Sequence, residues 1–121
     1  MNAQDCIFCK IVAGHIPCKK IFEDEDFFAF HDVRPAAPVH ALLIPRRHIA
    51  SLSACDENDV TLLGKMMQRV PHIAALLGVA DLEHETGGFR TIINTGPVSG
   101  QEVDHLHVHI LGGARPWSRM N

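Results

Sequence analysis

Imidazole and aliphatic side chains alternate without interruption in the segment His105-Leu106-His107-Val108-His109-Ile110-Leu111. Successive side chains of a β-strand point to opposite faces, so this alternation predicts three histidines on one face and the aliphatic residues on the other. We expect the aliphatic face to pack against a helix. Stability alone does not favour the row of imidazoles, because crowded rings repel one another when protonated. Such a row has two uses: a metal site, or nucleophilic and acid–base catalysis.

The composition places this segment in a small single domain. The chain has 121 residues, of which 46% are hydrophobic and 21% charged, and these values argue against disorder. Its 11 Lys+Arg against 14 Asp+Glu give a net charge of −3, which excludes a basic nucleic-acid binder. The N-terminal residues lack a basic export signal, and no apolar run is long enough to span a membrane. We therefore expect one cytoplasmic domain over residues 1–121, with neither nucleic acid nor a membrane as its partner.

Turn residues divide the chain into two expected helices and five expected strands. A short helix is expected over residues 6–13, and a long helix over residues 57–77, where apolar residues recur at steps of three and four. The expected strands span residues 20–22, 27–31, 39–44, 89–95 and 103–111. This order predicts an α+β fold, in which an antiparallel sheet of about five strands carries the long helix across one face.

The alternating segment matches the His-φ-His-φ-His-φ-φ signature of the histidine triad (HIT) family, in which φ is an apolar residue. The resemblance covers about residues 5 to 117. The other matching segments, in chain order, are Phe30-His31-Asp32-Val33, Pro35, Pro38, His40, Ile44-Pro45-Arg46-Arg47-His48-Ile49, Asn94-x-Gly96, Gly100-Gln101 and Gly112-Gly113. The chain resembles the small nucleotide-binding branch of the family, whose members act as purine nucleoside phosphoramidases. The resemblance implies a HIT-like fold and a homodimer that joins two sheets into one.

The resemblance also implies catalytic roles for three histidines. His107, the middle residue of the triad, would attack the α-phosphorus and form a nucleotidyl-imidazole intermediate that water then hydrolyses. An imidazole suits this role because it is nucleophilic when neutral near pH 7. His109 would donate hydrogen bonds to phosphate oxygens and could reach the departing amine. His40 would support the triad from a neighbouring strand.

A nucleotide site is implied in the same way. Asp32 resembles the family's acceptor for the ribose hydroxyls, and a carboxylate suits a vicinal diol. Asn94, Gln101 and the backbone amides of the Gly100 turn would form a cradle for the phosphate. The purine would contact four apolar residues, for each of which plain core packing is an equal alternative: Phe8, Ile11, Phe30 and Val33.

Two further positions leave the handling of the leaving group open. Glu102 stands where some family members carry Ser, and a carboxylate there would repel phosphate if it pointed inward. Either Glu102 faces away or the leaving group is handled differently. In the expected dimer, Trp117 would reach toward the partner's site and is a candidate for selecting the leaving group, with interface packing as the alternative.

Cys6 and Cys9 form a Cys-x-x-Cys pair, but a structural zinc ion prefers four ligands. Family members that carry this pair resemble a related transferase group, which adds a histidine equivalent to His48 and the first histidine of the triad. The resemblance thus implies a structural zinc site made of Cys6, Cys9, His48 and His105. The alternatives are two small buried hydrophobic residues or, less favoured because no βαβ unit surrounds them, a redox pair.

The function favoured by these residues is hydrolysis of purine nucleoside 5′-phosphoramidates, such as AMP joined to an amine or to lysine. Dinucleoside polyphosphate hydrolases and nucleotidyl transferases are alternatives within the enzyme class. The histidine at position 109, where the transferases carry Gln, argues for hydrolysis. A rival from another class is a non-catalytic nucleotide-binding or scaffold protein, in which the triad holds a nucleotide or a metal.

Overall fold

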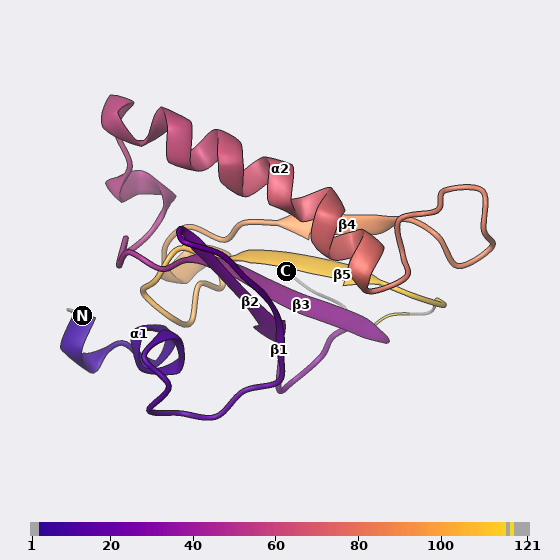
Figure 1. The fold of residues 1–121 in the computed structure, drawn as a ribbon, viewed down its shortest axis with the longest axis horizontal. Coiled ribbons are helices and arrows are strands. Elements are labelled where there is room, and N and C mark those ends of the chain that lie inside the picture. Colours follow the sequence, from indigo (N-terminus) through magenta and orange to yellow (C-terminus); the bar gives the residue numbers. More distant parts are fainter. Residues whose placement is uncertain (1–2, 116, 118–121) are drawn as a thin grey trace.

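A five-stranded antiparallel sheet forms the centre of the fold (Figure 1). The computed structural model describes residues 3–115 and residue 117. The strands are β1 (Lys20–Glu23), β2 (Phe27–His31), β3 (Val39–Pro45), β4 (Phe89–Ile92) and β5 (Val108–Gly112). They lie in the order β1-β2-β3-β5-β4, and every neighbouring pair is antiparallel. The α+β class predicted from the sequence is confirmed.

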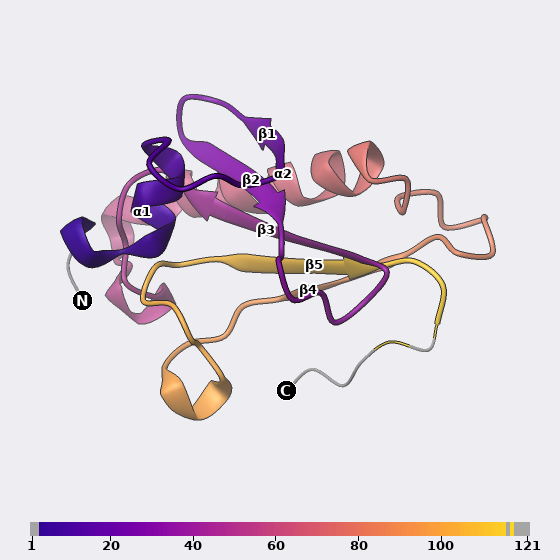
Figure 2. The same cartoon turned by 90° about the horizontal axis from the view of Figure 1, so that it is seen from below.

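Two helices cover opposite faces of this sheet. The long helix α2 (Val60–Leu76) crosses one face, and the short helix α1 (Ile7–Val12) lies on the other side near one end of the strands (Figures 1 and 2). The loop between β4 and β5, which contains a 3₁₀ turn at Pro97–Ser99, lies at the same end as α1. Among the described residues, no helix has the length and apolar character needed to cross a membrane.

Each face of the sheet has its own apolar core, because the central strands are buried on both sides. The four residues Phe27–Phe30 are all buried, and the sequence of β2 is accordingly a continuous apolar run rather than an alternating pattern. The α2 core contains Phe27, Ala29, Leu43, Met66, Val70, Ile73, Leu106, Val108 and Ile110 among its buried members. The α1 core contains Cys6, Phe8, Ile11, Phe28, Phe30, Leu42 and Ile44.

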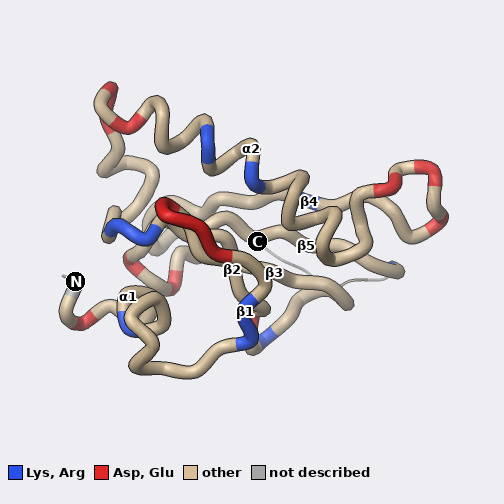
Figure 3. The backbone as a smooth tube through the Cα atoms, in the orientation of Figure 1, with Lys and Arg blue, Asp and Glu red and all other residues tan. Residues whose placement is uncertain are grey.

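Polar contacts fix the position of α2 on the sheet. Asp56 and Asp59 form a capping box around the 3₁₀ turn Glu57–Asp59, from which α2 continues. At the β1–β2 turn, Asp24 accepts a hydrogen bond from Arg69 at 2.8 Å, so the acidic turn lies against the basic residues of α2 (Figure 3). These contacts hold the helix over the face opposite the three histidines.

The last strand is shorter than predicted. We expected a strand over residues 103–111, but β5 begins at Val108, so His105 and His107 lie outside it and that part of the prediction is wrong. The partner strand β3 ends at Pro45, which has no N–H to extend the ladder. The segment before Val108 instead forms a hydrogen bond to the residues that follow β3: Leu106 N–H donates to the Ile49 carbonyl at 2.7 Å. Similarly, β4 ends at Ile92 rather than at residue 95.

Candidate active site and metal centre

The three histidines of the triad form one row on the α1 side of the sheet. The ring centroids of His107 and His109 are 4.9 Å apart, and Phe8 of α1 contacts His107 edge to face at 5.2 Å. Phe8 also lies 5.9 Å from the ring of His105. The histidines and the intervening aliphatic residues therefore lie on opposite faces as predicted, even though the strand is shorter, because the aliphatic residues pack under α2. All three imidazoles are buried.

The geometry fixes which nitrogen of His107 carries the proton. Nδ1 lies 2.6 Å from the carbonyl oxygen of His105, and because a carbonyl can only accept, Nδ1–H is the donor. The neutral ring therefore keeps a lone pair on Nε2. Burial lowers the pKa of His107, against the opposing effects of the His105 carbonyl, Asp32 and Glu102. A neutral imidazole with a bare Nε2 is the nucleophilic form of this side chain.

His109 belongs to a short hydrogen-bonded chain that leads to the β2–β3 loop. Its Nδ1 lies 2.9 Å from Nε2 of His40, and the peptide N–H of Ala36 donates to Nδ1 of His40 at 3.0 Å. Asp32 places a carboxylate oxygen 3.4 Å from His40 Nε2. Burial, reinforced by the neighbouring imidazoles of His107 and His40, lowers the pKa of His109 to about 3. Both rings of this chain are uncharged near neutral pH, because burial also lowers the pKa of His40.

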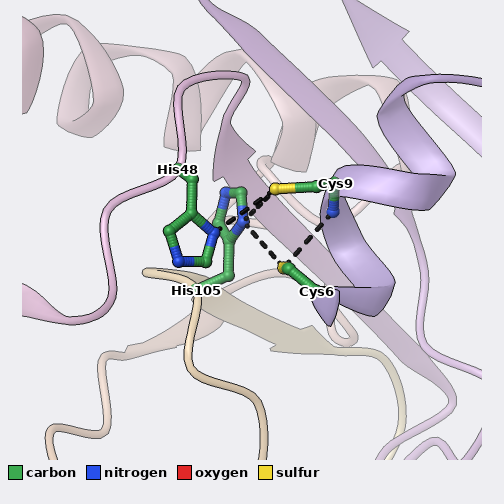
Figure 4. A group of neighbouring side chains, drawn as sticks. All are labelled: Cys6, Cys9, His48 and His105. Carbon is green, nitrogen blue, oxygen red and sulfur yellow. Dashed lines mark hydrogen bonds between the residues drawn. The ribbon is translucent and has the colours of Figure 1, made fainter. Parts of the chain in front are cut away.

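The four predicted metal ligands, one of which is the first histidine of the triad, lie close together at the start of α1. Figure 4 shows the side chains of Cys6, Cys9, His48 and His105 directed toward one another. Their ligand atoms all lie within 4.8 Å of one another. Cys6 Sγ is 3.3 Å from Nδ1 of His105, and Cys9 Sγ is 3.3 Å from Nδ1 of His48. Bond lengths typical of tetrahedral zinc give a sulfur-to-nitrogen separation of about 3.6 Å, so the spacing suits such an ion.

The hydrogen bonds around this cluster prepare two of its members for a cation. Nε2–H of His105 donates to the Pro45 carbonyl at 2.8 Å, which leaves Nδ1 with a lone pair directed at the thiols. Cys6 caps the start of α1, and its sulfur accepts the Cys9 N–H at 3.3 Å. Without a cation, burial and the neighbouring Cys6 raise the pKa of Cys9 to about 11, so metal binding must release that proton. The residues present therefore fit the zinc site that the resemblance implies.

The residues expected to contact the nucleotide differ in burial and in their distance from the triad. Phe8, Ile11 and Phe30 belong to the same buried core beneath α1, beside the triad. Val33, in contrast, is 91% exposed, which excludes the core-packing alternative for this residue. Asn94 is half-buried in the segment that follows β4.

The expected phosphate loop is closed by its own hydrogen bonds. Gly100 has a φ of 98°, as a glycine at a tight turn allows, but its N–H donates to the Pro97 carbonyl at 3.1 Å. The side chain of Gln101 accepts the Gly96 N–H at 2.8 Å and donates to the carbonyls of Ala50 and Val103 at 2.8 and 3.0 Å. In this conformation, Gln101 therefore joins three segments of backbone. Glu102 beside it is exposed.

Three backbone groups fix which ring nitrogen carries the proton in His105, His107 and His40, and the sequence did not indicate them. The carbonyls of Pro45 and His105 and the N–H of Ala36 each bond one imidazole nitrogen. Every residue carries such groups, so no sequence signal distinguishes them. The prolines that flank Ala36 at positions 35 and 38 are the nearest approach to a signal, because they restrict the loop that presents this N–H.

Comparison with known proteins identifies the family. The HIT domain family model matches residues 13–115. Protein HitA of Neisseria gonorrhoeae is 50% identical over 109 residues, which make up 90% of this chain and 96% of HitA. A HIT family hydrolase from Legionella pneumophila Philadelphia 1 has a crystal structure that matches with a TM-score of 0.84 and 40% identity, covering 92% of this chain and 95% of that one. A histidine triad protein from Clostridium difficile matches with a TM-score of 0.86 and 39% identity, covering 98% and 99% of the two chains. The chain belongs to the HIT family.

Proposed function

We propose that this protein hydrolyses purine nucleoside 5′-phosphoramidates through a nucleotidyl intermediate on His107. The observation that carries the proposal is the bare Nε2 of a neutral, buried imidazole beside a second imidazole 4.9 Å away. HIT family proteins bind nucleotides. The similarity to the Legionella HIT family hydrolase, at 40% identity, supports hydrolysis as the reaction.

The reaction would proceed in two displacements at phosphorus. In the first, His107 Nε2 forms a bond to the α-phosphorus, the phosphorus–nitrogen bond to the leaving group breaks, and the departing nitrogen takes a proton from solvent while it accepts a hydrogen bond from His109. In the second, water attacks phosphorus, the bond to His107 breaks, and the proton lost by that water returns to solvent. The products are the nucleoside monophosphate and the free amine, with both imidazoles restored.

The remaining predicted contacts would position the nucleotide for this attack. Asp32 would accept hydrogen bonds from the ribose hydroxyls, and its charge already acts on His107. The apolar residues beneath α1, with Phe8 against the nucleophile, would contact the purine. Asn94 and Gln101 would bind phosphate oxygens, which for Gln101 requires exchange of at least one of its present hydrogen bonds.

We also propose a structural zinc ion on Cys6, Cys9, His48 and His105. When bound, zinc would supply folding free energy and no chemistry at the substrate. Two ligands lie at the start of α1 and one lies two residues before the nucleophile, so the site would join the helix that carries Phe8 to the segment that carries His107. His105 would remain oriented by its hydrogen bond to Pro45.

A homodimer is the assembly we propose. The strand β4 lies at the edge of the sheet, where a second copy could continue the strand order. On α2, Val60 and Met67 are 67% and 41% exposed and lie at helical spacing with the exposed Gly64, so this outer face presents apolar and small residues. Trp117, whose indole N–H donates to the Gly113 carbonyl at 3.0 Å, would then approach the partner's site.

The proposal is tested by turnover of adenosine 5′-phosphoramidate and of its lysine conjugate, followed by release of AMP. We expect hydrolysis by the native protein and none by His107→Ala, with affinity for AMP changed by less than about threefold. His15→Ala, which alters an exposed histidine, serves as the control. Binding of AMP without turnover by the native protein would instead identify a non-catalytic nucleotide-binding protein. Faster hydrolysis of a dinucleoside polyphosphate would favour that substrate class.

A further inference from the structure

Glu102 lies where the loop between β4 and β5 leads into the triad. On one side of it, the Gln101 amide donates to the carbonyls of Ala50 and Val103 at 2.8 and 3.0 Å. On the other side, the Val103 carbonyl also accepts the His105 N–H at 2.9 Å. The backbone is therefore held on both sides of Glu102, which keeps this residue in a fixed place between the expected phosphate loop and the nucleophile.

The side chain of Glu102 is exposed, and its negative charge is uncompensated. Within the part of the chain that the structure describes, its carboxylate takes part in no hydrogen bond and no ion pair. The acidic β1–β2 turn differs, because Glu23, Asp24 and Asp26 each form an ion pair with a lysine or an arginine. Glu102 can therefore form an ion pair with a bound molecule without giving up an existing one.

The two charged side chains that act on the nucleophile are both negative. The electrostatic attraction of Asp32 and of Glu102 for positive charge reaches the ring of His107. The carboxylate of Glu102 is thus close enough to act on the site, although the side chain is exposed to solvent. The phosphate of a bound nucleotide would add further negative charge, so a positive group on the substrate would be attracted here.

The two carboxylates flank the triad from different directions. The β2–β3 loop, which carries Asp32, and the β4–β5 loop, which carries Glu102, lie at opposite ends of the central strands (Figure 2). A nucleotide with its ribose at Asp32 would extend its phosphate toward His107 and Gln101. The leaving group is attached on the far side of phosphorus from the ribose, so it would lie toward Glu102.

We propose that Glu102 is a specificity-determining residue that selects leaving groups with a positive charge. The inference rests on the proposed function, because it requires a nucleotide at the triad. The selected substrates would be phosphoramidates of diamines and of other amines that carry a second, protonated nitrogen. Because Glu102 is exposed, the ion pair is weak, and a preference of about three- to fivefold is expected.

The first test measures binding without turnover. Two uncleavable AMP analogues carry a chain on a carbon–phosphorus bond, and chains of equal length end in an ammonium or in a methyl group. Competition with a fluorescent AMP analogue gives the two dissociation constants. The native protein should bind the ammonium analogue about three- to fivefold more tightly at low salt, and this ratio should fall toward one in about 1 M salt because an exposed pair is screened.

Variants assign this preference to one carboxylate. Glu102→Gln should bind the two analogues equally. Asp104→Asn, which removes another exposed carboxylate two residues away, is the matched control and should keep the native ratio. A native ratio near one, an unchanged ratio in Glu102→Gln, or an equal loss in Asp104→Asn would each overturn the proposal.

The second test measures kcat/KM for the AMP phosphoramidates of cadaverine and hexylamine, which differ only in the charge at the end of the chain. The native protein should prefer the cadaverine adduct about three- to fivefold, and Glu102→Gln should show no preference. Glu102→Arg should instead prefer the adduct of aminocaproate, which ends in a carboxylate. Equal kcat/KM values in the native protein would overturn the inference alone. If the native protein cleaves no adduct but binds the ammonium analogue preferentially, the proposed function fails while the role of Glu102 in recognition stands.

Discussion

Replacing Gln101 with Ala tests whether this residue supports the loop or binds phosphate. The buried amide makes three hydrogen bonds to backbone groups of Gly96, Ala50 and Val103. At a net value of about 1 kcal/mol for each bond, the variant should lose about 3 kcal/mol of unfolding free energy. For a chain of 121 residues, that loss corresponds to a decrease of about 12 °C in Tm.

The assay is urea unfolding at a fixed protein concentration, so that any dimer contributes equally to each variant. Val98→Ala is the matched control, because Val98 lies in the same loop and is fully exposed, and it should change stability by less than about 0.5 kcal/mol. A loss below about 1 kcal/mol for Gln101→Ala would refute the structural role. If KM for the phosphoramidate then rose more than tenfold, Gln101 would be a phosphate ligand first.

Three further predictions concern the metal, the start of α2 and the charge of the triad. Removal of the proposed zinc ion by a chelator should speed amide hydrogen exchange in α1 more than in α2, since Cys6 and Cys9 lie at the start of α1; equal changes would contradict a local cross-link. Asp59→Asn should be less stable than the native protein at pH 7. The Asp56 N–H and the Arg47 guanidinium lower the pKa of Asp59, so its stabilisation exists above the carboxyl's ordinary pKa and should vanish as acid protonates Asp59 in the folded protein; a difference that persists in strong acid would argue against this cause. Finally, burial lowers the pKa of His109 to about 3, so proton NMR should show no titration of this ring between pH 5 and 8, where an inflection would contradict its burial as a neutral group.

The sequence displays the alternating period of the histidine segment, and this period made it possible to predict which face of the sheet each of its side chains would occupy. Alternation alone places Leu106, Val108 and Ile110 under α2 and the histidines under α1. The start of the strand could not be predicted from the same alternation. It depends on where the partner strand stops donating, at Pro45, which is 60 residues distant from His105 in the chain.

In the candidate site too, some features could be predicted from the sequence and others could not. The cluster of two cysteines and two histidines was predictable because these residues are chemically distinct and the resemblance supplied their pairing across the chain. The proton positions were not, because they are set by backbone groups such as the Ala36 N–H, which the sequence does not single out. Val33 and Gln101 show a related limit: a matching position indicates a residue's neighbourhood, while its exposure and hydrogen bonds depend on the folded loop.

The most direct test is to locate the nucleotidyl group during turnover. Native protein mixed with an excess of adenosine 5′-phosphoramidate, quenched in alkali to preserve phosphorus–nitrogen bonds, and mapped by peptide mass spectrometry should carry one adenylyl group, bonded to Nε2 of His107. An adenylyl group on any other side chain, or turnover in which the protein never becomes labelled, would contradict the account.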